Sequence, residues 1–134
     1  MGYRSDVTIV VAVERIHSQT LWAAYQMDDL VQKEKIYSEW RTVIHGKHAV
    51  LFIYEHDWVK WYDDYPDVQA IEKLMHLPSE MNLNYAWRKV RIGEEWNDIE
   101  EDMEVGGPDE IMVQELEDHI YDVLNIERRT VLEV

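Results

Sequence analysis

The chain has 134 residues, enough for one domain with a packed core. Hydrophobic residues make up 46% of it and cysteine is absent, which excludes disulfide scaffolds, thiolate metal sites and cysteine nucleophiles. The formal net charge of −15 argues against a protein that binds nucleic acid directly through a basic face.

The first elements in chain order are a strand, a helix and a hairpin. Apolar residues on both faces of residues 7–13 predict a strand at the centre of a sheet. Residues 18–38 are rich in helix-forming side chains, and Ser18 is predicted to cap the first turn of this helix. The β-prone runs 40–44 and 49–55 lie on either side of Gly46, which predicts a hairpin.

A second helix and a fourth strand follow. Apolar spacing predicts a helix over residues 66–77, with Pro66 as its first residue and Pro78 marking its end. Alternating residues over 84–92 predict a strand. The resulting order is that of an α+β, ferredoxin-like βαββαβ core, an antiparallel sheet with its helices on one face. We expect five apolar side chains to lie in its interior: Val11, Leu51, Ile53, Ile71 and Val90.

The last third of the chain holds nearly all of the net charge. Residues 94–134 contain 15 acids and two bases, whereas residues 1–93 contain 13 acids and 11 bases. The spacing of Trp96, Ile99 and Met103 predicts a short acidic helix within residues 94–110. Residues 111–134 are ambiguous: Leu116, Ile120 and Leu124 have a helical spacing, but the β-prone runs 120–124 and 130–134 favour further strands. We expect this acidic C-terminal part, residues 94–134, to pack on the core of residues 1–93 within a single domain 1–134.

Catalytic and metal-binding patterns are weak. His45 and His48 are three residues apart, but they lie beside a turn, where imidazoles more often point into solvent. No serine lies in a GxSxG motif, and the chain has no glycine-rich phosphate loop. We therefore expect no enzymatic activity, cofactor or metal. A small metal-dependent hydrolase stays open as an alternative, because the 28 acids offer many carboxylate pairs.

An aromatic segment points to a protein partner. Trp58, Trp61, Tyr62 and Tyr65 lie within eight residues, too close together for all of them to face inward, so at least two should be exposed. Exposed Trp and Tyr side chains anchor protein interfaces, whereas base stacking requires a basic groove, and the neighbours here are acidic.

The acidic block of residues 94–118 suggests how such a partner is recognised. A small domain needs a net charge of only about 2–8 for solubility, and carboxylates on a rigid surface can imitate the phosphates of DNA. The expected partner is a protein with a basic surface, for example a nucleic-acid-binding factor. The predicted partner-binding residues are the aromatics Trp58, Trp61 and Tyr62 and the acids Glu94, Glu95, Asp98, Glu100, Glu101, Asp102 and Glu104. The alternative is a structural or self-associating protein, such as a homodimer, whose acids only confer solubility.

Three segments carry a resemblance to a known group. Met1–Val7, Lys60–Gln69 and Arg91–Glu95, the last followed by Asn97–Glu100, resemble small, mostly uncharacterised proteins encoded by tailed bacteriophages, over roughly residues 1–105. The resemblance implies no catalytic residue or cofactor. It implies a viral accessory protein, such as an inhibitor of a host factor, in the host bacterial cytoplasm. The chain has no apolar run of the ~18 residues that a membrane span requires.

Overall fold

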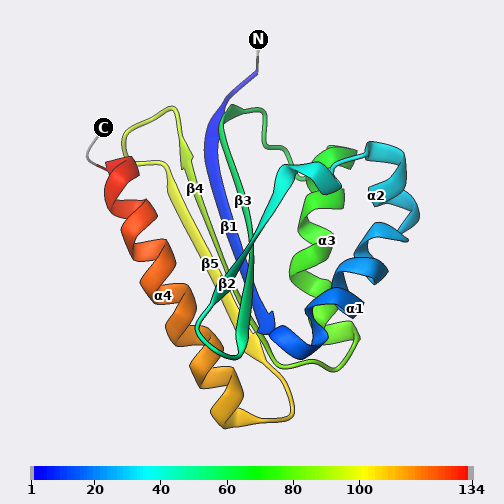
Figure 1. Cartoon of the computed structure of the whole chain (residues 1–134). Helices are drawn as coiled ribbons and strands as arrows, with labels where there is room; N and C mark the ends of the chain where they lie inside the picture. The colour runs from blue at the N-terminus through cyan, green and yellow to red at the C-terminus, as the bar shows by residue number, and fades with distance from the viewer. Residues whose placement is uncertain (1, 133–134) are drawn as a thin grey trace.

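The strands form one five-stranded antiparallel sheet in the computed structural model, which describes the backbone of residues 2–132 and the side chains of residues 2–123. The strands are β1 (Ser5–Glu14), β2 (Trp40–His45), β3 (Ala49–Val59), β4 (Tyr85–Gly93) and β5 (Ile99–Gly106). Their order across the sheet is β2-β3-β1-β4-β5, so β1 is central and β2 and β5 are the edges. Helices cover both faces, and the molecule has three layers (Figure 1).

The central strand β1 is apolar on both sides, as predicted. Its successive side chains point to opposite faces of the sheet, because a strand is pleated. Ile9 and Val11 pack in the core under the first three helices, whereas Val10 and Ala12 pack in the core under the last helix. All four side chains are fully buried, so this strand supplies both cores of the molecule.

The first three helices cover one face of the sheet. They are α1 (Arg15–Gln26), α2 (Asp29–Glu34) and α3 (Pro66–Glu80), with a short 3-10 helix, η1 (Tyr37–Glu39), before β2. The single helix predicted over residues 18–38 is therefore wrong in its bounds, because the helix is interrupted at Met27 and Asp28 and a second helix begins at Asp29. The carboxylate of Asp28 caps α2 by accepting hydrogen bonds from the backbone N–H groups of Leu30 and Val31, at 2.9 and 3.1 Å.

Two predicted helix boundaries are also wrong. Ser18 does not cap a helix, because α1 begins directly after β1; its hydroxyl donates to the carbonyl of Arg15 at 2.8 Å from within the helix. Pro66 is the first residue of α3, as predicted, but Pro78 does not end the helix, which continues to Glu80. Pro78 lies in the last turn, where its missing N–H removes only one helical hydrogen bond.

The C-terminal third differs most from the prediction. The segment expected to be an acidic helix is the strand β5, which pairs with β4 from Ile92↔Ile99 to Tyr85↔Gly106. The segment expected to form strands is the helix α4 (Glu110–Leu132). Tertiary pairing decides both cases, because β4 offers a free edge to β5 and the opposite face of the sheet offers an apolar surface to α4.

Helix α4 closes a second core on that opposite face (Figure 1). Its side chains Leu116 and Ile120 are fully buried against residues of β1, β3 and β4. The expected arrangement with helices on one face holds for α1, α2 and α3 only. The five predicted core residues are confirmed, since each is at most 5% exposed: Val11, Leu51, Ile53, Ile71 and Val90.

Candidate functional site

The predicted acids of β5 lie beside basic residues of β4. The ammonium of Lys89 is 2.9 Å from a carboxylate oxygen of Glu72 on α3, 3.9 Å from one of Asp102 and 4.0 Å from one of Glu100. The Lys89 side chain is only 8% exposed. Because this one cation is shared among three carboxylates, it offsets the negative charge of Glu100 and Asp102 only in part. Glu100 also lies 3.3 Å from the guanidinium of Arg91.

Other predicted acids also have partners inside the molecule. Arg88 lies 3.0 Å from Glu101 on the α4 side of the sheet, and its guanidinium carbon is 5.3 Å from the ring centroid of Tyr121. Glu104 accepts a hydrogen bond from the hydroxyl of Tyr85 at 2.7 Å. The contact with Arg88 reduces the negative charge that Glu101 presents to a partner, whereas the neutral hydroxyl of Tyr85 fixes Glu104 without reducing its charge. The role of these acids in partner binding stays a prediction.

Asp98 is the centre of a third cluster, between β4 and β5. The guanidinium of Arg91 donates to both carboxylate oxygens at 2.9 and 3.2 Å, and the hydroxyl of Tyr3 donates at 2.6 Å. The hydrogen bonds from Arg91, and then from Tyr3, hold the pKa of Asp98 below its ordinary value. The same bond to Asp98 raises the pKa of Tyr3.

We predict that Tyr3→Phe raises the pKa of Asp98 toward its ordinary value, because it removes a hydrogen bond that favours the ionised form. The lowered pKa means that ionised Asp98 stabilises the fold above about pH 4, and that this contribution is lost as the pH falls through the folded-state pKa. A ¹³C NMR titration of the carboxyl group measures the change. Tyr37→Phe, in η1, is the control and should leave the pKa of Asp98 unchanged. If the pKa of Asp98 in Tyr3→Phe equals that in the original chain, the prediction is wrong.

The aromatic segment divides between surface and interior. Trp58 is 60% exposed and Tyr65 is 38% exposed, which confirms that at least two of the four aromatics face solvent. Trp61 is only 8% exposed and packs against Tyr54, with ring centroids 5.7 Å apart. Tyr62 is half-buried, and its hydroxyl accepts the backbone N–H of Tyr3 at 2.6 Å. Of the three aromatics predicted to bind a partner, Trp58 is the one that the structure presents to solvent.

Helix α4 carries a second set of acids. The strands predicted for this segment would not have placed these acids on one surface. Val113, Leu116 and Ile120 recur at spacings of three and four and face the sheet. The acids occupy other positions of the helix, and the described side chains of α4 include no lysine or arginine. These acids are exposed or half-buried: Glu110, Glu115, Glu117, Asp118 and Asp122.

His45 meets a histidine that no sequence pattern singled out. Its Nδ1 lies 2.6 Å from Nδ1 of His119 on α4, so one imidazole donates to the other, and the expectation that His45 points into solvent is wrong. His48 is exposed, as expected. The opposite ring nitrogen of His119 is 3.8 Å from a carboxylate oxygen of Glu115. Among the described residues, no group of three or more His, Asp or Glu side chains is placed to hold a metal ion.

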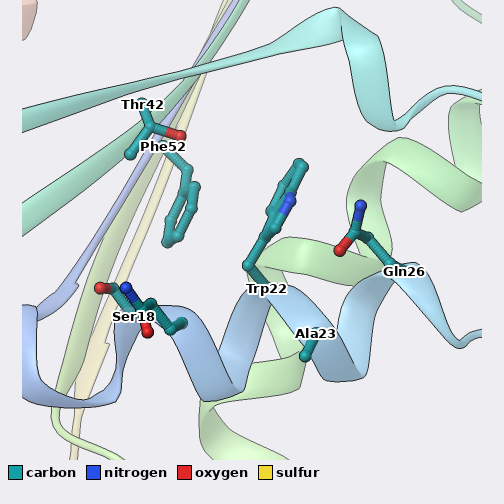
Figure 2. A pocket seen from close by; sticks show the side chains of 7 residues that line it. Ser18, Trp22, Ala23, Gln26, Thr42 and Phe52 are labelled. Carbon is teal, nitrogen blue, oxygen red and sulfur yellow. The ribbon is translucent and has the colours of Figure 1, made fainter.

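A pocket of about 220 Å³ lies between α1 and the β2–β3 hairpin. Figure 2 shows Trp22 rising from α1 beside Phe52 of β3, with Thr42 of β2 above them. The two rings are nearly parallel, with centroids 5.4 Å apart. None of the described residues that line the pocket is charged, so it is separate from the acidic surfaces.

The chain was compared with protein-family models, curated proteins and solved structures, and none of the three comparisons gives a match. Within residues 2–132, no helix is both long and apolar enough to span a membrane.

Proposed function

We propose that the chain is a non-enzymatic phage accessory protein that binds and inhibits a host protein with a basic surface in the bacterial cytoplasm. The observation that supports this most is the acidic face of α4, defined by Glu110, Glu115, Glu117, Asp118 and Asp122. The acids of β5 share the cations of β4 and are compensated in part, whereas the described side chains of α4 itself include no lysine or arginine. Such a surface attracts a basic protein and accelerates its association.

The charge spacing favours a general basic partner over close imitation of DNA. Five acids between Glu110 and Asp122 extend over about 18 Å of helix, or one carboxylate per about 4 Å. Duplex DNA carries about one charge per 1.7 Å, more than twice that density. A nucleic-acid-binding factor is one partner that meets this description, because its basic surface would tolerate the wider spacing.

We also infer that the first four strands with α1 and α3 form a ferredoxin-like unit, to which β5 and α4 are additions. The neighbour order β2-β3-β1-β4 and the antiparallel pairing of these strands support the inference. The partner-binding surfaces then belong largely to the additions.

We predict that the triple variant Glu117→Gln, Asp118→Asn, Asp122→Asn weakens partner binding by about tenfold at low salt. Each exposed charge contributes a few tenths to one kcal/mol, and tenfold corresponds to about 1.4 kcal/mol. The partner is first isolated by pull-down from bacterial lysate and identified by mass spectrometry. Its affinity is then measured at several salt concentrations, and the difference between the variant and the original chain should shrink as salt rises.

The matched control removes three acids from other exposed positions, as Asp63→Asn, Asp64→Asn, Glu80→Gln. It has the same net charge as the α4 variant and should bind nearly as well as the original chain. If the affinity is independent of salt and equal in the original chain, the α4 variant and the control, the proposal is refuted. The acidic face of α4 would then serve only solubility.

A further inference from the structure

Two tryptophans are exposed at one end of the sheet. Trp58 is 60% exposed and Trp96 is 90% exposed. Trp58 lies in β3, one residue before its end, and Trp96 lies in the loop between β4 and β5. The end of β3 and this loop lie at the same end of the sheet as the N-terminus (Figure 1). Exposed tryptophans are uncommon because each leaves a large apolar area in water.

The backbone holds Trp58 in an unfavourable conformation. Its φ of +58° lies in the left-handed region, which is rare and unfavourable for a bulky side chain. Side chains at the start of the chain hold both of its backbone groups: the N–H donates to Asp6 at 2.8 Å, and the carbonyl accepts from Arg4 at 3.2 Å. The β1–β3 register shifts between Ser5 and Val7 at the same place. Bulges of this kind redirect side chains.

The loop that carries Trp96 is held by several hydrogen bonds. The carboxylate of Asp98 is fixed by Arg91 and Tyr3, and its backbone carbonyl accepts the N–H of Gly93 at 2.8 Å. The hydroxyl of Tyr3 also accepts the backbone N–H of Glu95 at 3.2 Å. Trp96 therefore lies in a short, multiply bonded loop, although the sequence pattern placed it on the apolar face of a helix.

Arg4 connects the end of β3 to the loop between β4 and β5. Its backbone N–H donates to Glu94 at 3.2 Å, while its guanidinium donates to the carbonyl of Trp58. The exposed acids at this end include Asp57, Glu94 and Glu95. The indole of Trp58 at the end of β3 and that of Trp96 in the β4–β5 loop are thus presented from segments that Arg4 connects, and carboxylates lie close to each of them in sequence.

We propose that Trp58 and Trp96 form a recognition surface for an arginine-bearing segment of the partner, an inference that rests on the proposed binding of a basic protein. A guanidinium stacks on aromatic faces, tryptophan being the most favourable, and pairs with carboxylates through two parallel hydrogen bonds. An apolar segment would fit less well, because it would desolvate the neighbouring acids without pairing them. The ammonium of lysine is more strongly hydrated and lacks the planar fork.

The experiment uses the full chain and a capped peptide that contains four arginines separated by glycines. The tryptophan indole N–H signals are followed by ¹H–¹⁵N NMR, and the signals of Trp58 and Trp96 should shift saturably while that of Trp22 stays in place. Trp58→Asn removes the ring and suits the left-handed backbone; it and Trp96→Ser should each weaken peptide binding about fivefold. Tyr37→Ser, which removes an aromatic 39% exposed in η1, is the control and should bind as the original chain does.

Three results would overturn the inference. They are unmoved Trp58 and Trp96 signals, equal shifts with a peptide that has glutamine in place of arginine, and unchanged affinity in both tryptophan variants. Shifts confined to α4 amides would refute this surface but leave the proposed function in place. Conversely, the tryptophan signals could shift while the α4 substitutions leave the affinity for the partner unchanged. That result would refute the role of α4 and retain this surface.

Discussion

Leu116→Ala should lower the free energy of unfolding by about 2–5 kcal/mol, the range for removing a buried leucine side chain from a packed core. Leu116 is fully buried in the core between α4 and the sheet, where Ile120 is its buried neighbour one turn along the helix. The loss combines the transfer of apolar area with the cavity left behind, because the surrounding structure relaxes only partially around a deleted side chain. Urea unfolding followed by circular dichroism measures it.

Ile111→Ala is the matched control on the same helix, since Ile111 is 83% exposed. Substitution of an exposed side chain away from special features usually changes stability by no more than about 0.5 kcal/mol. If Leu116→Ala were as mild as Ile111→Ala, α4 would not be docked on the sheet, and its acidic face would have no fixed position.

The elements with strong local patterns were predictable. Residues 7–13 are apolar on both faces, which only a central strand accommodates, and the β2–β3 hairpin has Gly46 in its turn with a φ of +73°. Pro66 identified the start of α3 correctly because its own chemistry suits the first helical position. In each case the information lies within a few neighbouring residues.

The C-terminal third was not predictable in this way. Trp96, Ile99 and Met103 have helical spacing, yet the segment from Ile99 is a strand. Its alternating carboxylates Glu100 and Asp102 lie beside Lys89 of the adjacent strand β4. That pairing brings together residues that a local pattern does not connect. The helical spacing in α4 was visible, but its β-prone residues competed with it, and only the uncovered apolar face of the sheet favours the helix.

The candidate surface was predictable in its residue types but not in its assembly. Exposure of Trp58 follows from crowding in the aromatic segment, whereas the part played by Arg4 depends on contacts more than 50 positions away in the chain. The contact of His119 with His45 likewise joins α4 to the hairpin across 74 positions. No local motif signals either contact.

Lys89→Met should destabilise the fold by about 1–3 kcal/mol. Breaking a fully buried ion pair costs about 3–5 kcal/mol, but the three carboxylates around Lys89 are partly hydrated, with side chains 21%, 49% and 56% exposed for Glu72, Glu100 and Asp102. Without the ammonium, these carboxylates repel one another across α3 and β5. Urea unfolding at low salt measures the loss, and added sodium chloride should recover part of it by shortening the screening length from ~10 Å at 0.1 M to ~3 Å at 1 M.

The matched control is Lys73→Met, which removes a cation from α3 that lies 3.1 Å from Asp28 but is 44% exposed. Exposed ion pairs contribute at most about 1 kcal/mol, so this variant should be the milder of the two and less responsive to salt. Lys89→Met should also strengthen binding of a basic partner, because it removes the cation beside Asp102 and one of the two cations beside Glu100 on β5. Equal losses of stability in the two variants would show that Lys89 does not compensate the acids of β5, and those acids would then belong to the binding surface.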